Sequence, residues 1–391
     1  MEIIKQENYT TNSFSNLNNS SYYQNTDRSE QKLNEEIWDS FSKFTQYTDN
    51  IKVKQNYRLT NERTLNEHTS TITCLVKISN TQFASASDDH SIKIWDSETG
   101  FCLKNLKEHF LTVNCLIKVN EFELVSGSED SLIKIWNLKS TEGTSTKTIY
   151  EHTGPILCLL KVNNSQLISE SMDKTFKMWS WNSNKEIVTC IKTFDKQFTP
   201  IYTLINECNT NNKNLTFHSL DNLQTMSLNN KVEKSDGLSL NCLIKLFDSQ
   251  ISSNSEKYSI KIWETSKGTC TSTKKRNGHN GIVVSLIHLN DQKFVTGCLD
   301  NSIKIWNSKN GKLLFKITEH TKAVTCLLKL TSDVFASGSC DNSIRIFNAI
   351  NGVCLKNYEN HSSPIICLIK MSDNQIISGS MDKEIKIWDF E

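Results

Sequence analysis

Serine, histidine and aspartate recur together along this chain, and these residue types could perform nucleophilic catalysis. Six histidines are each matched by an aspartate that lies six residues before a tryptophan or, once, a phenylalanine. The pairs are His68 and Asp89, His109 and Asp130, His152 and Asp173, His279 and Asp300, His320 and Asp341, and His361 and Asp382. A catalytic triad needs one convergent set of groups, so six dispersed copies predict neither catalysis nor a shared metal site. We therefore expect a non-enzymatic protein with no catalytic residues, cofactor or metal ligands.

Six of the 13 cysteines share one local context, an apolar run that ends in lysine, typically Cys-Leu-x-Lys. They are Cys74, Cys115, Cys158, Cys242, Cys326 and Cys367. No pair among them has the short spacing of a zinc site. Cysteine behaves as a small hydrophobic residue, so one per unit on a buried strand predicts core packing. The odd total indicates free thiols in a reducing compartment.

The composition excludes several classes of protein. Hydrophobic residues make up 37% of the 391 residues, enough for a core, so the chain is not disordered as a whole. No run approaches the ~18–20 apolar residues of a membrane span, and the N-terminus lacks a signal-peptide core. The 44 basic and 43 acidic residues nearly cancel, which gives no electrostatic footprint for nucleic acid or membrane. We expect a cytoplasmic protein, with the nucleus as the alternative.

A period near 41 residues organises the chain. Near-identical segments end at Trp95, Trp136, Trp179, Trp263, Trp306, Phe347 and Trp388, in steps of 41, 43, 84, 43, 41 and 41. The long step is twice 42, so one degenerate unit lies within it and the chain has eight units. Within each unit, alternating apolar residues and turn residues at ~10-residue spacing predict four short antiparallel strands.

The repeated segments Glu-His, Ser-Gly-Ser-x-Asp and Ile-Lys-Ile-Trp-Asp resemble the WD-repeat (WD40) family, with Trp95-Asp96 and Trp388-Asp389 intact. The resemblance covers about residues 56–391 and implies an all-β fold, a β-propeller of four-stranded antiparallel blades. Closure into a ring buries each face of a blade against its neighbour and protects the strand edges.

The last unit reaches Glu391 directly after its third strand. Arg58 to Leu65 supplies a candidate fourth strand, because it leads into the same Leu-x-Glu-His sequence that ends at His109. We therefore predict that the N-terminal strand closes the last blade. Eight blades are predicted, and seven remain the alternative if the degenerate unit forms a loop.

The resemblance implies that the recurring polar residues form a structural network within each blade, since a buried imidazole and carboxylate must find partners. The network residues are His68, Asp89, Trp95, His109, Asp130, Trp136, His152, Asp173, Trp179, His279, Asp300, Trp306, His320, Asp341, His361, Asp382 and Trp388. The lysine of Ile-Lys-Ile-Trp is interpreted as a further repeat feature, with a functional basic ring as the alternative.

The residue before each turn aspartate is expected, from the family, to face the narrow upper side of the propeller. With one residue that follows a histidine, the candidate partner-binding residues are Asp88, Phe110, Glu129, Met172, Leu299, Cys340 and Met381. The first two blades would present acidic residues and the others mainly apolar ones. Such adaptable apolar and methionine-rich patches suit peptide recognition.

Two regions depart from the repeat. The fourth and fifth units, from about Phe194 to Trp263, lack several template residues, which indicates either neutral decay or a specialised partner surface. Residues 1–55 are rich in Asn, Ser and Tyr and are expected to be a largely disordered arm. An apolar stripe over about residues 28–45 predicts an amphipathic helix for packing, docking or self-association.

The strongest functional hypothesis is a non-catalytic scaffold or adaptor that binds partner proteins or peptides on the propeller surface. The alternative is a substrate-recognition subunit of a ubiquitin ligase, because the repeat style is similar to eight-bladed F-box/WD-repeat proteins. Residues 1–56 show no F-box, and the chain has few of the arginines that favour bidentate phosphate capture. Partners are therefore expected to be proteins, with no nucleic acid and no membrane.

Overall fold

The chain divides into two units after Asn56, and the computed structural model describes residues of the second unit. The described residues are 57–391 except 141, 164–165, 183–184, 196–242, 248–249, 256–258, 265–268 and 275–278. The arm over residues 1–55, its helix at 28–45 and the degenerate fourth unit lie outside them and stay predictions. The described residues contain no helix with the length and hydropathy that crossing a membrane requires.

Within the described residues, twenty-eight strands form seven four-stranded antiparallel sheets. The first three consecutive sheets are β2 (Ile72–Lys77), β3 (Gln82–Ser87), β4 (Ile92–Asp96) and β5 (Cys102–Leu106); β6 (Val113–Lys118), β7 (Glu123–Ser128), β8 (Ile133–Asn137) and β9 (Ser145–Ile149); and β10 (Ile156–Asn163), β11 (Gln166–Ser171), β12 (Thr175–Asn182) and β13 (Lys185–Asp195). The next three are β14 (Leu243–Phe247), β15 (Gln250–Ser255), β16 (Ser259–Glu264) and β17 (Thr269–Lys274); β18 (Val283–Asn290), β19 (Lys293–Cys298), β20 (Ile303–Asn307) and β21 (Leu313–Ile317); and β22 (Val324–Lys329), β23 (Val334–Ser339), β24 (Ile344–Asn348) and β25 (Cys354–Tyr358). The seventh joins β26 (Ile365–Ser372), β27 (Gln375–Ser380), β28 (Ile385–Phe390) and β1 (Leu59–Leu65).

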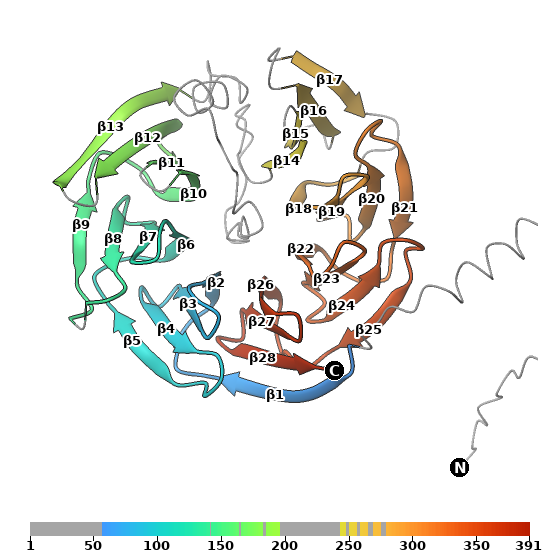
Figure 1. Ribbon diagram of the computed structural model, residues 1–391, viewed down its shortest axis with the longest axis horizontal. Coiled ribbons are helices and arrows are strands. Elements are labelled where there is room, and N and C mark those ends of the chain that lie inside the picture. The colour runs from blue at the N-terminus through green and yellow to red at the C-terminus, as the bar shows by residue number, and fades with distance from the viewer. Residues whose placement is uncertain are drawn as a thin grey trace, which may run out of the picture. The chain divides into compact units, whose positions relative to one another are not determined.

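The sheets stand side by side as blades around a common centre (Figure 1). The first strand of each unit lies nearest the centre, and these innermost strands contact each other in the order β10, β6, β2, β26, β22, β18 and β14. This arrangement confirms the predicted all-β class and propeller architecture. The number of blades stays a prediction, since the unit between β13 and β14 is outside the described residues.

The N-terminal strand completes the last sheet, as predicted. β1 pairs antiparallel with β28, with Leu65 opposite Ile385 and Arg63 opposite Ile387. The Arg63 guanidinium also lies 3.2 Å from the Asp389 carboxylate. One blade therefore contains strands from both ends of this region, so its hydrogen bonds link segments more than 300 residues apart.

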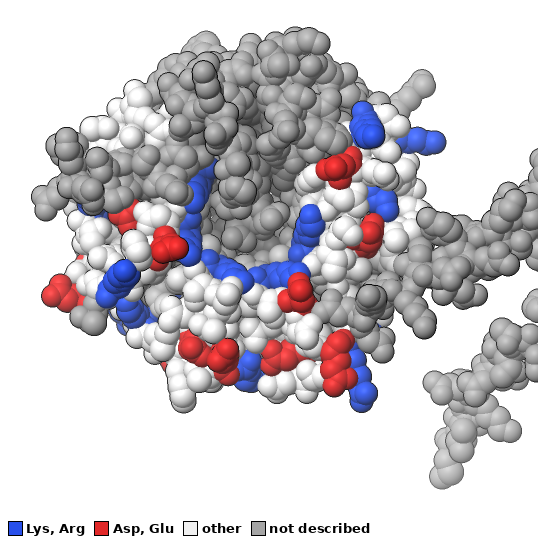
Figure 2. Space-filling model, in the orientation of Figure 1, with Lys and Arg blue, Asp and Glu red and all other residues white. Residues whose placement is uncertain are grey.

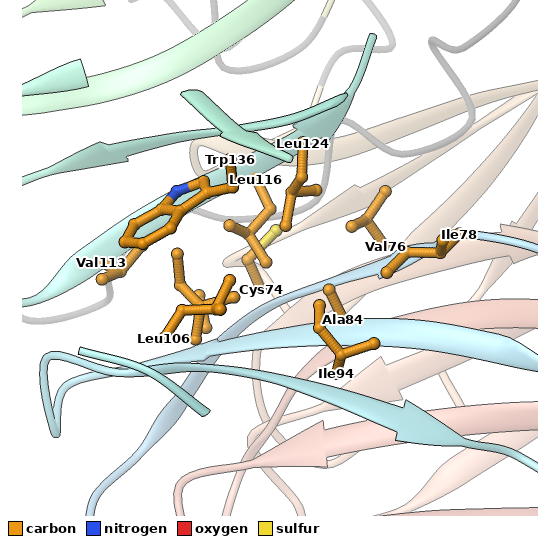
Figure 3. Close-up of a cluster of buried hydrophobic side chains, with 12 residues drawn as sticks. Cys74, Val76, Ile78, Ala84, Ile94, Leu106, Val113, Leu116, Leu124 and Trp136 are labelled. Atoms are coloured by element: carbon orange, nitrogen blue, oxygen red, sulfur yellow. The ribbon is translucent and has the colours of Figure 1, made fainter. Parts of the chain in front are cut away.

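The hydrophobic core lies between blades. Figure 3 shows a cluster that joins two sheets. From the first sheet come Cys74, Val76, Ala84, Ile94 and Leu106, and from the second come Val113, Leu116, Leu124 and Trp136. Full burial of such side chains contributes about 1.5–3 kcal/mol each, which holds neighbouring blades together.

The cysteines of the repeat follow the core prediction in most blades. Cys74, Cys115, Cys326 and Cys367 are buried, and Cys158 is half-buried. Cys242 lies outside the described residues. The ten cysteines whose side chains the structure describes are free thiols. Burial raises the pKa of Cys326 to about 12, so this thiol packs as a neutral group.

A glycine in the second strand makes room for the next blade. A Cβ on Gly379 of β27 would lie 2.5 Å from Ile72 Cγ2 and 2.8 Å from Cys367 Sγ. Ile72 belongs to β2, so this contact joins the last blade to the first. Ala86 occupies the equivalent position of β3. It shares a cluster with Val113 of the next blade, which is smaller than Ile72. At this junction the glycine leaves the space that Ile72 occupies.

Gly379→Ala is therefore expected to destabilise the protein by about 1–3 kcal/mol, because the added methyl overpacks the junction between the last and first blades. Urea unfolding of the full-length variant measures this cost. Ala86→Gly, which removes a methyl at the equivalent position, serves as the comparison and should cost no more than about 1 kcal/mol. A Gly379→Ala midpoint equal to that of the parent protein would contradict the packing argument.

Candidate functional site

A chain of buried hydrogen bonds runs through each blade, and the first blade shows its geometry. His68 Nδ1 lies 2.7 Å from Asp89 Oδ2, and His68 Nε2 lies 2.7 Å from Ser85 Oγ. The Trp95 indole donates to the same Ser85 oxygen at 2.7 Å. The imidazole therefore joins the Asp89 turn to the Ser85 strand, and Ser85 in turn joins the Trp95 strand to both.

The same network recurs in all six blades for which the sequence pairs a histidine with an aspartate. In five of them the His Nδ1 to Asp oxygen distance is 2.6–2.8 Å, whereas in the sixth His279 lies 3.2 Å from Asp300. Thr296 replaces the serine in that sixth blade. Phe347 replaces the tryptophan in the His320 blade and packs edge-on against the imidazole. The structure thus brings together every predicted histidine, aspartate and tryptophan of each network.

The hydrogen-bond directions are consistent with one protonation pattern. The indole N–H is a donor only, so the Ser85 hydroxyl accepts from Trp95 and can donate to His68 Nε2. His68 Nδ1–H then donates to the Asp89 carboxylate. With a neutral imidazole, every donated proton in this series of hydrogen bonds has an acceptor. The serine hydroxyl is fully buried, so no substrate can reach it as a nucleophile.

Burial and hydrogen bonding compete at the network aspartates. At Asp173 burial is the largest single influence and would raise the pKa, but hydrogen bonds from Thr175, His152 and Thr153 together lower it to about 2. The pKa values of Asp89, Asp300 and Asp341 are also well below the usual range for the same reasons. These carboxylates are therefore ionised, which fixes the orientation of the imidazoles.

Among the residues that the structure describes, two groups of side chains each bring three potential metal ligands together. In the first group the ligand atoms of His279, Cys298 and Asp300 lie within 4.8 Å of one another, and the same holds for the second group. The second group is His361, Asp382 and Glu384. In the first group burial raises the pKa of Cys298 to about 12, which opposes thiolate formation. The Asp300 oxygens already accept hydrogen bonds from Asn280 and Ser302, so the blade network accounts for this cluster.

The lysine of Ile-Lys-Ile-Trp pairs within its own blade. The basic nitrogen and the glutamate oxygen are 2.9–3.9 Å apart in five blades. The pairs are Lys93 with Glu67, Lys134 with Glu108, Lys177 with Glu151, Arg345 with Glu319, and Lys386 with Glu62. Lys93, Lys134, Lys304 and Lys386 are buried. These residues therefore brace the blades and do not form an exposed basic ring.

The turn after each second strand places the residue before the network aspartate at one end of the central space. Its backbone N–H donates to the carbonyl of the residue that immediately precedes the innermost strand, at 2.8–3.0 Å. The six bonds are Asp88 to Thr71, Glu129 to Thr112, Met172 to Pro155, Leu299 to Ile282, Cys340 to Ala323, and Met381 to Pro364. We call these six turn residues, with Phe110, the rim residues.

The rim residues differ in exposure and chemistry. Phe110 is 77% exposed and Met172 is 52% exposed, whereas the other five are half-buried. The Phe110 backbone N–H donates to Asp130 Oδ2 at 3.1 Å, so the network positions this aromatic ring as well as the turns. Burial raises the pKa of Asp88, partly offset by hydrogen bonds from Thr71 and Thr112. The rim therefore presents acidic and apolar side chains on a fixed backbone.

Sequence patterns missed two parts of this arrangement. Thr296 as a serine equivalent could have been found from its position ten residues before Trp306. The pairing of Lys93 with Glu67 could also have been found, because a glutamate precedes the histidine in most units. In both cases the residues recur at a constant spacing, but only the folded structure shows that Thr296 meets Trp306 and that Lys93 meets Glu67.

Comparisons with known proteins agree with this geometry. Six segments of the chain, together more than half of its length, match the family model described as "WD domain, G-beta repeat". They are residues 59–96, 100–137, 143–180, 268–307, 311–348 and 352–389. No curated protein matches the chain. A similar solved structure is the crystal structure of the computationally designed Ika8 protein, with a TM-score of 0.63 and 22% identity over 84% of this chain and 98% of that one. This likeness supports the fold alone.

The substitution of Phe347 for tryptophan allows a matched test of the network. Ser126→Ala leaves both His109 Nε2 and the Trp136 N–H without their partner, whereas Ser337→Ala leaves only His320 Nε2. Since an unsatisfied buried group costs about 1–3 kcal/mol, we expect Ser126→Ala to destabilise the protein by about 1–2 kcal/mol more than Ser337→Ala. Urea unfolding measures both values, and equal costs would contradict the proposed hydrogen bonds.

His279 is expected to titrate in acid. Burial, the largest influence, lowers the pKa of His279 to about 4 although Asp300 favours the charged form. A histidine with a lowered folded-state pKa contributes stability that is fully present above about pH 6.5 and is lost as the pH falls toward about 4. NMR titration, with the signal assigned by its absence in His279→Gln, should show a midpoint below pH 5. A midpoint near 6.5 would show that this imidazole is not desolvated.

Proposed function

Because the chain belongs to the WD40-repeat family, we propose that it is a non-catalytic scaffold or adaptor that binds protein partners on its rim residues. WD40 repeats typically mediate protein–protein interactions, and the fold is generally an interaction scaffold without catalytic function. The observation that supports this rim as the site is the exposed apolar pair Phe110 and Met172, held on turns that the buried networks fix. Large exposed apolar side chains gathered in one region indicate interaction surfaces.

The chemistry of the rim suggests the kind of partner segment. Asp88 and Glu129 occupy neighbouring blades, and Phe110 begins the loop into the second of these. Met172, Leu299 and Met381 supply flexible apolar side chains on other blades. We therefore expect a peptide segment with basic residues beside apolar ones, whose charges would complement the acidic blades.

Rigidity of the rim favours binding. A surface that is already ordered loses little conformational entropy when a partner binds. The turn aspartates and serines hold the rim by hydrogen bonds such as Asp89 N to Ser87 Oγ at 3.1 Å and Ser91 N to Asp89 Oδ1 at 3.0 Å. The rim backbone is thus expected to keep its conformation when the partner docks.

The cellular setting is part of the proposal. We propose a cytoplasmic location, with the nucleus as the alternative, because ten free cysteines suit a reducing compartment. Residues 28–45 are proposed as a second docking or self-association element. Affinity purification of the full-length protein from its own cells tests the ligase alternative: stoichiometric recovery of a cullin adaptor would favour that function over a general scaffold.

Met172→Glu combined with Met381→Glu is expected to reduce partner binding at least tenfold, since the new charges would have to be desolvated against the partner's apolar residues. Partners recovered with the parent protein by affinity purification and mass spectrometry provide the reference, and quantitative pull-down measures the loss.

The matched control is Val353→Glu combined with Leu314→Glu. Val353 is 52% exposed, the same fraction as Met172, but lies in the turn between β24 and β25. The control should retain all partners and should unfold at the same temperature as the rim variant. Undiminished capture by the rim variant would place the binding surface elsewhere.

A further inference from the structure

Five lysines lie on consecutive blades, at the end of the innermost strands that is opposite the rim. They lie at one repeat position, the lysine of the Cys-Leu-x-Lys segments, on or near the last residue of an innermost strand. These channel lysines are Lys77, Lys118, Lys161, Lys329 and Lys370. Figure 2 shows basic side chains gathered around the hollow at the centre of the blades, with acidic side chains mostly farther out. An innermost strand of six residues separates the two ends by roughly 20 Å.

Three of the channel lysines donate hydrogen bonds to the neighbouring blade. Lys77 Nζ donates to the carbonyl of Met371, and Lys118 Nζ donates to that of Ile78. Lys370 Nζ donates likewise to Leu330. Each acceptor follows the channel lysine of the neighbouring blade, so the same interaction recurs at three junctions between blades. An ammonium group has three donors, so one such bond leaves two for a ligand at Lys77 and Lys118, and Lys370, which also bonds Asp373, keeps one.

Their charges are weakly compensated. Lys370 pairs with Asp373 at 2.7 Å, whereas within the described residues the other four form no ion pair. Burial lowers the pKa of Lys77, and the charges of Lys370 and Lys118 lower it further. Burial and the charge of Lys118 also lower the pKa of Lys161. This contrasts with the lysines of Ile-Lys-Ile-Trp, which pair with glutamates in their own blades.

We propose that the channel lysines form a binding site for a compact anion that carries several phosphate groups, such as an inositol polyphosphate. Several ammonium groups converge on one space, so a ligand with many charges on a small body can meet them at once. Lysine binds phosphate as a point charge and does not require the planar bidentate geometry of arginine. An extended acidic peptide would lose more conformational entropy for the same number of charge contacts.

The direct test is isothermal titration calorimetry of the full-length protein with inositol hexakisphosphate. We expect saturable binding that weakens steeply between about 50 and 200 mM salt, because several charges are neutralised together. The triple variant Lys77→Gln, Lys118→Gln, Lys370→Gln should bind at least about tenfold more weakly. Lys118→Gln alone, a milder change, should weaken binding about threefold or more.

A variant with the same loss of charge is the control. Lys107, Lys309 and Lys312 are exposed lysines in turns outside the innermost strands, and their replacement by glutamine should change affinity less than about twofold. Thermal unfolding of both triple variants establishes that they are folded. An equal loss in both variants would show non-specific attraction, and unchanged binding by both Lys118→Gln and the channel triple variant would overturn the proposal.

Two further probes identify the source of the phosphates. Phosphatidylcholine vesicles containing phosphatidylinositol bisphosphate test a lipid headgroup, and inositol hexakisphosphate tests a free ligand. Binding of the vesicles that is lost in the channel variant would assign the headgroup, whereas binding of the soluble compound alone would assign the free polyphosphate. Tighter binding of a glutamate decamer than of either phosphate compound would contradict the proposal.

Discussion

The buried hydrogen-bond chain from tryptophan through serine and histidine to aspartate is the interaction on which the other features of each blade depend. An ionised carboxylate and an imidazole are costly to bury unless each lone pair and proton has a partner. In the first blade, Asp89 meets this requirement with His68, Ser91 and the Thr69 backbone. The same bonds fix the turn that follows the second strand. The conformation of the rim is therefore a consequence of satisfying a buried charge.

The network tolerates change where the hydrogen-bond inventory still balances. Phe347 removes an indole donor, and the space is filled by stacking on Phe335 with ring centroids 5.4 Å apart. Thr296 keeps the hydroxyl that serine supplies elsewhere, and it still accepts from Trp306 at 2.9 Å. Substitution is thus accommodated when a donor is removed and its acceptor keeps another partner, as Ser337 does with His320, or when the hydroxyl is kept.

Two sets of lysines at constant repeat positions have opposite environments. Lys93, Lys134 and Lys386 on the third strands are buried beside glutamates and contribute to the blade. Lys77 and its equivalents lie on the innermost strands, and the charges of Lys118 and Lys370 on the neighbouring blades act on Lys77. Figure 2 shows basic side chains gathered around the hollow at the centre. The difference follows from strand position, because only the innermost strand of a blade borders the centre of a propeller. A repeat therefore concentrates one residue type there without any motif dedicated to binding.

The sequence by itself determined the fold class, the four strands of each repeat and the pairing of the N-terminal strand with the last blade, because these follow from local periodicity and from one unit lacking its fourth strand. It also determined which histidines, aspartates and tryptophans belong together, since their spacing is constant. Only the tertiary structure decided the exposure of Phe110, the fit of Gly379 against Ile72 and the convergence of the channel lysines. These features arise between blades, where residues far apart in sequence meet, and local patterns hold no information about such distances.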